Sequence, residues 1–418
     1  MRADQITTIL WKGRNIEVAA GRLLVKVRPG MEEAFIDLVE KAFAKLAEFE
    51  SQNVPLFGSL ARLLLSELPP PKTVWEKLSG NWLLGRLGIE RSLQKTIEKL
   101  LGQAEALGIE FVEPDPIHRA LIAPNDTLFA ESWAHQRLRS VEAWQLSDGS
   151  DDVRLALVDS GVRMSDGVVA HVDFDPQRFV LADDLVDNLM PPSDESGHGT
   201  SIAGILAATR NNGQGVAGMN HTSKVVIYRV FDADDHAVGT RVLEAFRRAV
   251  RDSRTANKRL VINYSGGSLA TTERFKEGCA ELTAQGDVLI CCAAGNSGPI
   301  HEPGVFAGAN PALVCVGSIR SDGTVANASS RGPELTVTAP GVDIKTTTRD
   351  GSFDFVSGTS AAAGFVSGIA SLVWSRKPTL TAKQVRDILI QSTDRTTHSI
   401  NRGFGTVDAR KALELAGT

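Results

Sequence analysis

Residues 156–162 read Ala-Leu-Val-Asp-Ser-Gly-Val, a short apolar run that ends in an acid and a glycine turn. The run lacks polar alternation, so it predicts a strand buried on both faces of a parallel sheet. Similar runs recur along the chain, separated by helical patterns. The predicted strands are 155–158, 225–230, 260–263, 288–292 and 313–316, and the predicted helices are 199–209, 239–252, 271–285, 360–375 and 381–392. This order predicts an α/β fold with a doubly wound, mostly parallel sheet flanked by helices.

The first 122 residues follow a different pattern. Apolar runs at 23–27 and 109–112 predict strands, helical spacing recurs at 31–46 and 93–104, and Glu-Pro-Asp-Pro at 113–116 predicts a turn. We therefore expect two domains. The first is a small α+β domain over residues 1–122 with a helical insertion at about 50–105, and the second covers 123–418.

Composition excludes two classes of partner. The chain has 418 residues, with 45 Lys and Arg against 50 Asp and Glu, so its formal net charge is −5. A slightly acidic chain has no basic field for a nucleic-acid backbone, and no run approaches the roughly 20 apolar residues that span a bilayer. We expect neither nucleic acid nor membrane as a partner.

The cysteines and the first residues of the chain indicate the cellular compartment in which we expect the protein. Cys279, Cys291, Cys292 and Cys315 lack the spacing of a zinc knuckle or a Cys-x-x-Cys motif, so they predict no metal site. Cys291 and Cys292 lie in an apolar run, which is typical of buried, inert thiols. The opening stretch, MRADQITTILWKGRN, has no apolar core of signal-peptide length. These features predict a cytoplasmic protein.

Three segments place a reactive side chain at a strand end or a helix start. They contain Asp159 after a strand, His198 in Gly-His-Gly-Thr-Ser, and Ser360 in Ser-Gly-Thr-Ser-Ala-Ala-Ala-Gly. Each residue alone is most often a turn, a surface position or a helix cap. Together they supply the hydroxyl, the imidazole base and the orienting carboxylate of nucleophilic acyl chemistry.

Asn296 is a candidate hydrogen-bond donor for the same chemistry. It follows a predicted buried strand and Gly295. Gly-Asn alone is typical of a turn, but the Asn amide can also donate to a developing oxyanion beside the Ser360 N–H. The four residues Asp159, His198, Ser360 and Asn296 are therefore the candidate catalytic group.

These segments resemble the subtilisin-like serine proteases, the subtilase or peptidase S8 family, and in particular its thermitase-like branch. The resemblance covers about residues 123–413, and its matching segments are 123–126, 158–161, 198–200, 211–218, 293–296 and 358–360. It implies that Ser360 is the nucleophile of a serine endopeptidase, with His198 as the base. Ala361 and Gly364 depart from the Met and Pro usual in the family, and the pair Ser201-Ile202 departs from the commoner His-Cys or His-Val. None of these departures removes a catalytic atom, and Ala361 is expected to open space near Ser360.

The same resemblance implies how a protein or peptide substrate binds. The segment Ser265, Gly266 and Gly267 is similar to the strand that pairs with the substrate backbone, although Ser-Gly-Gly alone is also a turn. A wall of the first specificity pocket corresponds to Ala293, Ala294 and Gly295. Glu302, near the base of that pocket, either favours a basic residue before the scissile bond or points to solvent.

The resemblance also bears on cofactors. The chemistry requires none. Related proteases often hold a structural calcium ion, and Asp126 and Asn211 fit that pattern, but a second Asp is missing at its aligned place near Val168. The sequence therefore leaves a structural calcium ion open and assigns no metal ligands.

Residues 1–122 resemble the propeptide domain of the family. The resemblance implies a domain whose tail occupies the substrate cleft, with cleavage between Arg119 and Asn125. The segments 54–68 and 75–87 either enlarge the core of this domain or dock an activating protein partner. The expected function is therefore an intracellular, autoinhibited or self-processing endopeptidase. Two alternatives stay open: a regulatory or binding protein plugged by its first domain, and an acyltransferase or esterase with the same triad.

Overall fold

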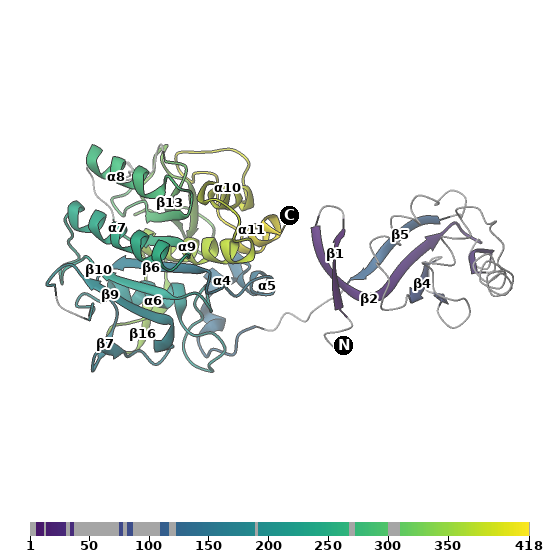
Figure 1. Ribbon diagram of the computed structural model, residues 1–418, viewed down its shortest axis with the longest axis horizontal. Coiled ribbons are helices and arrows are strands. Elements are labelled where there is room, and N and C mark those ends of the chain that lie inside the picture. Colours follow the sequence, from purple (N-terminus) through teal and green to yellow (C-terminus); the bar gives the residue numbers. More distant parts are fainter. Residues whose placement is uncertain are drawn as a thin grey trace. The chain divides into compact units, whose positions relative to one another are not determined.

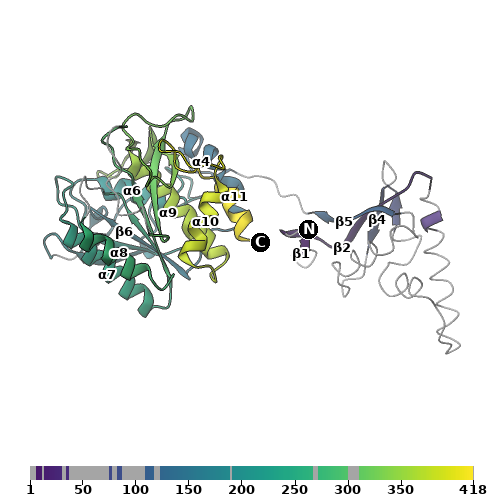
Figure 2. The ribbon, with the colours of Figure 1, turned by 90° about the horizontal axis from the view of Figure 1, so that it is seen from above.

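The computed structural model describes residues 6–11, 14–30, 34–36, 75–77, 82–86, 109–116, 123–188, 191–266, 272–299 and 310–417. The chain divides into two compact units, residues 1–120 and 121–417 (Figures 1 and 2). Within the described residues, no helix is both long and apolar enough to cross a bilayer.

The first unit contains an antiparallel sheet with the order β1-β2-β4-β3, and β5 also pairs with β2. Val25 and Val27 of β2 and Val112 of β5 are buried. The strands are β1 (Ile6–Trp11), β2 (Arg14–Val27), β3 (Trp75–Lys77), β4 (Trp82–Arg86) and β5 (Ile109–Pro116).

One sequence prediction for this unit was wrong, and another falls on residues that the structure describes only in part. Residues 113–116 are not a turn, because they continue β5 beside β2. Proline lacks an N–H, but a strand at the margin of a sheet tolerates that loss. The predicted helical insertion at about 50–105 contains strand β4, which pairs with β2, and strand β3, which pairs with β4. The rest of this range lies outside the described residues. The predicted helices at 31–46 and 93–104 lie almost wholly outside the described residues.

The second unit confirms the predicted doubly wound parallel sheet. Its order is β14-β13-β12-β11-β6-β10-β9, and every neighbouring pair is parallel. Strand β6 lies inside the sheet, with β9 and β10 on one side and β11 to β14 on the other, so strand order switches at β6. Ligand sites of such sheets form at the carboxyl ends of the strands beside this switch. The strands are β6 (Val153–Asp159), β9 (Phe179–Asp184), β10 (Val225–Arg229), β11 (Arg259–Tyr264), β12 (Val288–Ala293), β13 (Leu313–Ile319) and β14 (Val337–Pro340).

The two strands that the sequence did not predict are the edges of this sheet. β9 ends in Asp183 and Asp184, and β14 ends in Pro340. Neither reads as a continuous apolar run, because an edge strand needs less apolar side-chain area than a central one. Hydrogen bonding to a neighbour therefore defines these strands more than composition does.

Helices cover both faces of the sheet. α6 and α9 contact one face and α7 and α8 the other, and each face has its own cluster of buried apolar residues (Figures 1 and 2). The helices are α4 (Trp133–Leu138), α5 (Ser140–Trp144), α6 (His198–Ala207), α7 (Gly239–Thr255), α8 (Glu273–Thr283), α9 (Thr359–Arg376), α10 (Ala382–Ser392) and α11 (Ala409–Ala416). Two short hairpins complete the unit, β7 (Met164–Ser165) with β8 (Val168–Val169), and β15 (Ile344–Thr347) with β16 (Phe353–Val356).

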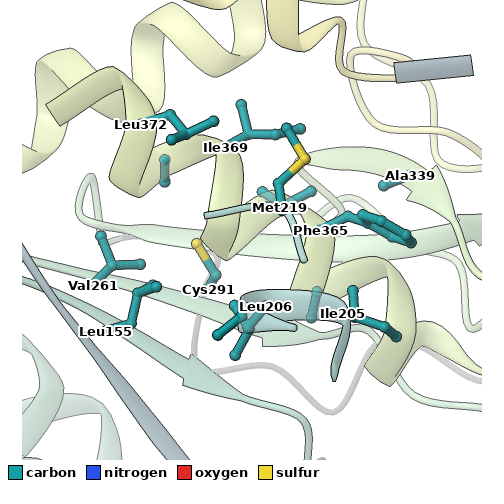
Figure 3. Packing of buried hydrophobic residues seen from close by; sticks show 14 of the residues in the cluster. Leu155, Ile205, Leu206, Met219, Val261, Cys291, Ala339, Phe365, Ile369 and Leu372 are labelled. Carbon is teal, nitrogen blue, oxygen red and sulfur yellow. The ribbon is translucent and has the colours of Figure 1, made fainter. Parts of the chain in front are cut away.

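Helix α9 runs through the core and is buried on nearly all sides. Figure 3 shows Phe365, Ile369 and Leu372 among apolar side chains of α6 and the sheet strands. A Cβ at Gly364 would lie 3.2 Å from the Ile205 Cγ2 of α6. Glycine therefore suits this close packing of α6 against α9, and α9 runs without a break from Thr359 to Arg376.

Candidate active site

Asp159 and His198 meet at the carboxyl edge of the sheet. β6 ends at Asp159, which is fully buried, and α6 begins at His198. The His198 Nδ1 lies 2.7 Å from the Asp159 Oδ1, which also accepts the Ser160 N–H at 2.8 Å. This contact orients the imidazole so that Nε2 is the nitrogen left to exchange a proton with a substrate.

The carboxylate also sets the charge state of the imidazole. Burial disfavours the charged form of His198, but the negative charge of Asp159 and its hydrogen bond outweigh burial and raise the pKa of His198 to about 9. Asp235 and Asp194 add smaller contributions of the same sign. The imidazolium that forms when His198 accepts a proton is therefore strongly stabilised.

A buried hydroxyl and a buried acid position the start of α6. The Ser160 Oγ accepts the Gly199 N–H at 2.8 Å and donates to the Asp194 Oδ1 at 2.8 Å. Asp194 also accepts the N–H groups of Gly197, at 2.8 Å, and Thr200, at 2.9 Å. Sequence reasoning missed this acid, although an acid just before a helix start is a recognisable capping signal.

Ser360 lies on the other helix that begins at this edge. It is the second residue of α9, with 9% of its surface exposed. Its Oγ donates to the Ser265 carbonyl at 3.0 Å, and the Ser265 Oγ donates to the Ser360 carbonyl at 3.3 Å. To give its proton to His198, the hydroxyl must rotate away from Ser265. Catalytic hydrogen bonds commonly form only once substrate is bound.

Asn296 is held so that its amide N–H₂ is available. Its side-chain oxygen accepts the Thr359 N–H at 2.9 Å and the Thr359 hydroxyl at 3.1 Å. The Ser360 N–H is one of the first N–H groups of α9, which have no acceptor inside a helix. Two donors are thus placed beside the nucleophile, where an oxyanion forms during acyl transfer. Sequence reasoning missed Thr359, whose signal was its place next to Ser360.

The predicted substrate edge follows β11. Ser265 is buried and Gly266 half-buried directly after that strand, and Gly267 lies outside the described residues. Ala293 and Ala294 are buried at the end of β12, and Gly295 follows with a φ of +103°. Glu302 also lies outside the described residues.

Three of the candidate catalytic residues line one cavity. Its volume is about 980 Å³, and His198, Ser360 and Asn296 all line it. Ala361 lines it too, as expected of a small side chain beside the nucleophile. Three of the four predicted segments thus line one opening, and the fourth contacts it through the bond between Asp159 and His198.

The residues considered for calcium lie elsewhere, near the loop 211–216. The acid that faces this loop is Asp173 rather than a residue near Val168. Its Oδ1 accepts the Asn212 amide at 2.7 Å and its Oδ2 the Val216 N–H at 2.8 Å. Asp126 accepts the N–H groups of Asn211, at 3.0 Å, and Asn212, at 3.4 Å.

These contacts decide whether the site fits a cation. Calcium needs six to eight oxygen ligands that face one point. Here the chain's own N–H groups occupy both oxygens of Asp126 and of Asp173. Burial, opposed by its hydrogen bonds, also raises the pKa of Asp173 to about 6. In this arrangement the residues do not fit a bound calcium ion.

The fold and the converging Asp, His and Ser side chains define an α/β protein with a nucleophile-base-acid constellation. The chain belongs to the subtilase family, since the Peptidase S8 profile of that family matches residues 150–407. This confirms the resemblance seen in the sequence.

Named relatives agree with the family. The chain is 31% identical over 271 residues to a thermophilic serine proteinase of Bacillus sp. (strain AK1), covering 64% of each chain. It is 30% identical over 265 residues to subtilisin E of Bacillus subtilis, covering 63% of this chain and 66% of the relative. The chain thus spans just under two thirds of these relatives. Among solved structures, it is similar to a chain described as proteases from Pseudoalteromonas arctica, with a TM-score of 0.62 and 26% identity, over 71% of this chain and 100% of that one.

Proposed function

We propose that the protein is a serine endopeptidase. The observation that carries the proposal is the contact of 2.7 Å between Asp159 and His198, at a cavity that Ser360 and Asn296 also line. The proposal agrees with family membership and with the serine proteinases among the relatives.

The geometry supports the following steps. The Ser360 hydroxyl turns from the Ser265 carbonyl to the His198 Nε2 and attacks the peptide carbonyl carbon, while His198 takes its proton. Asp159 stabilises the imidazolium, and the Asn296 amide and the Ser360 N–H hold the oxyanion.

The second half of the reaction reverses these transfers. His198 gives its proton to the leaving amine as the C–N bond breaks, which leaves an acyl ester on Ser360. A water molecule, deprotonated by His198, hydrolyses the ester and restores the hydroxyl. The steps use only groups of the chain and water, so we propose that the chemistry needs no cofactor.

We further propose that residues 1–122 are an inhibitory propeptide and that the protein works in the cytoplasm. The resemblance of this segment to family propeptides supports the first point. All four cysteines are free and buried, which is compatible with a reducing compartment and supports the second. An activating protein partner that displaces residues 1–122 belongs to the same proposal.

The test follows intact-protein mass over time for wild type and Ser360→Ala. We expect only the wild type to split near residues 119–125, and only the wild type to gain the mass of a fluorophosphonate probe. Cleavage of a peptide in preference to a matched ester separates an endopeptidase from an esterase.

Labelling without splitting would contradict the propeptide proposal and leave the enzyme intact. Absence of both splitting and labelling in the full-length chain would contradict catalysis, and would favour a protein plugged by residues 1–122.

A further inference from the structure

The cavity beside the triad extends beyond the groups that the proposed chemistry uses. From Ser360 and Ala361 it passes Ile202 of α6 and reaches the residues after β6 and the turn between β15 and β16. Arg163 and Arg349 are part of this lining. A volume of about 980 Å³ leaves room for substrate side chains as well as for the reacting bond.

The position of this cavity identifies the part of a substrate that would enter it. The described parts of the substrate edge, Ser265 and Gly266, do not line it, whereas His198 and Ser201 of α6 do. His198 protonates the leaving amine, so the leaving chain lies on the imidazole side of the scissile bond. Residues after the scissile bond therefore face this cavity.

Both arginines are anchored by carbonyl groups. The Arg163 Nε donates to the Ala170 carbonyl at 3.1 Å, and its Nη1 donates to the Arg349 carbonyl. The Arg349 Nη1 donates to the Glu195 carbonyl. A carbonyl group orients a guanidinium without neutralising it. Over the described part of the chain, neither arginine forms an ion pair with a carboxylate.

The acids near this rim form their hydrogen bonds and ion pairs with groups other than the two arginines. The Asp350 Oδ1 accepts two bonds from Ser352, at 3.0 Å from N–H and 2.7 Å from Oγ, and a third from Thr348. Asp194 is buried and takes the bonds that position α6. The Glu195 carboxylate pairs with Arg229 at 2.6 Å.

Asp194 and Asp350 each carry a formal negative charge in the same lining, but among the described residues neither acid forms an ion pair with Arg163 or Arg349. His198, which also lines the cavity, is neutral when it acts as the base. The two guanidiniums are therefore cations of this lining that are held by carbonyl groups and can still pair with a bound carboxylate. Guanidinium groups bind carboxylates with two parallel hydrogen bonds.

We propose that Arg163 and Arg349 bind a carboxylate on the leaving-group side of the scissile bond. This inference rests on the proposed endopeptidase function and adds a preference to it. The carboxylate comes either from an Asp or Glu side chain one or two residues after the bond, or from the carboxyl terminus of a short leaving peptide. The apolar part of the lining, Ile202, Val356 and Ala361, contacts the stem of that residue.

The test uses the full-length chain and quenched fluorescent peptides that differ only after the scissile bond. One pair has Glu or Gln at the first position, one has Glu or Gln at the second, and one ends after two residues as a free acid or an amide. We expect the carboxylate member of at least one pair to have a kcat/KM about fivefold higher, which is the range of a partly exposed ion pair. The advantage shrinks at high salt. The pair that responds identifies the source of the carboxylate.

Arg349→Gln should reduce the ratio of kcat/KM between the carboxylate peptide and its neutral partner to near one. Cleavage of the neutral peptides should continue. Its backbone carbonyl still accepts from Arg163, so the rim keeps that contact. Arg251→Gln is the matched control, because Arg251 is an exposed arginine of α7 outside the cavity. It should leave the ratio unchanged.

Equal kcat/KM within every pair would overturn this inference and leave the proposed function standing. If no peptide is cleaved, the same pairs are bound to Ser360→Ala and followed by fluorescence anisotropy. Tighter binding of the carboxylate member, lost in a second variant with Arg349→Gln, would support the inference without turnover. Equal binding would refute it.

Discussion

The side-chain oxygen of Asn296 accepts two hydrogen bonds from Thr359, one from its N–H at 2.9 Å and one from its hydroxyl at 3.1 Å. Thr359 immediately precedes Ser360, so the turn that presents the nucleophile also orients the amide. The proposed oxyanion donor and the proposed nucleophile are therefore positioned by one short segment.

This relationship predicts a graded loss of turnover. Asn296→Ala removes the amide donor and should lower kcat about 10²–10³-fold with little change in KM, the magnitude known for such a donor in subtilisin itself. Thr359→Val removes only the hydroxyl bond and should cost less. Steady-state kinetics on one peptide measures both. A loss in Thr359→Val that equals the loss in Asn296→Ala would contradict the division of roles.

The Asp159–His198 pair predicts the pH dependence of activity. His198 must be neutral to accept the Ser360 proton, and its pKa is raised to about 9. We expect kcat/KM to increase with pH and to level off above about 9. Asp235 contributes to the raised pKa, so Asp235→Asn should move the profile to lower pH at an unchanged maximum. A profile that levels off near 6.5 would show that Asp159 does not stabilise the imidazolium in this way.

A substitution at Gly199, directly after His198, tests the close contact of α6 with the turn after β6. An added Cβ at Gly199 would lie 2.2 Å from the Gly161 carbonyl oxygen. We expect Gly199→Ala to lower the free energy of unfolding by about 1–3 kcal/mol, because backbone must move, and to lower activity as well. The control is Gly239→Ala at the start of α7, where the nearest atom would be 3.7 Å away. Urea unfolding should show that variant unchanged within about 0.5 kcal/mol.

Acid should destabilise the protein through His135. This residue contacts the Ala217 carbonyl at 2.8 Å and the Ser140 hydroxyl at 3.0 Å, and burial lowers its pKa to about 4. The unfolded chain gains a proton at this site below about pH 6.5, and the folded chain only near pH 4, so stability falls as pH drops between these values.

The loss in the free energy of unfolding from this one residue reaches about 3 kcal/mol. Urea unfolding at a series of pH values measures it, and His135→Gln should flatten the slope. Burial also lowers the pKa of His171 and His221, so part of the slope remains. An unchanged slope in His135→Gln would show that these other groups account for it.

The hydrogen bonds of the loop 211–216 predict that calcium has little effect on the thermal stability of the protein. The oxygens of Asp126 and Asp173 already accept N–H groups of this loop. We expect a chelator to leave the thermal unfolding midpoint unchanged, and Asp173→Asn to alter the midpoint equally with and without calcium. A midpoint that rises with added calcium in the wild type, but not in Asp173→Asn, would show that the loop rearranges around the ion.

Local sequence determined much of the fold and the candidate catalytic residues. Central strands such as β6 and β12 are buried on both faces, so they must be continuously apolar, and a continuous apolar run is visible without a structure. Asp159, His198, Asn296 and Ser360 each sit in a short segment where small neighbours leave room for a substrate. Those segments could be recognised one at a time.

Only the tertiary structure decided which other residues meet these four. The edge strands β9 and β14 depend on pairing rather than on composition, and β5 continues through Pro114 and Pro116 because β2 lies beside it. Asp194, Thr359, Arg163 and Arg349 act through contacts with parts of the chain that are distant in sequence. Spacing along the chain does not encode such contacts, because they arise only when the sheet brings its loops to one edge.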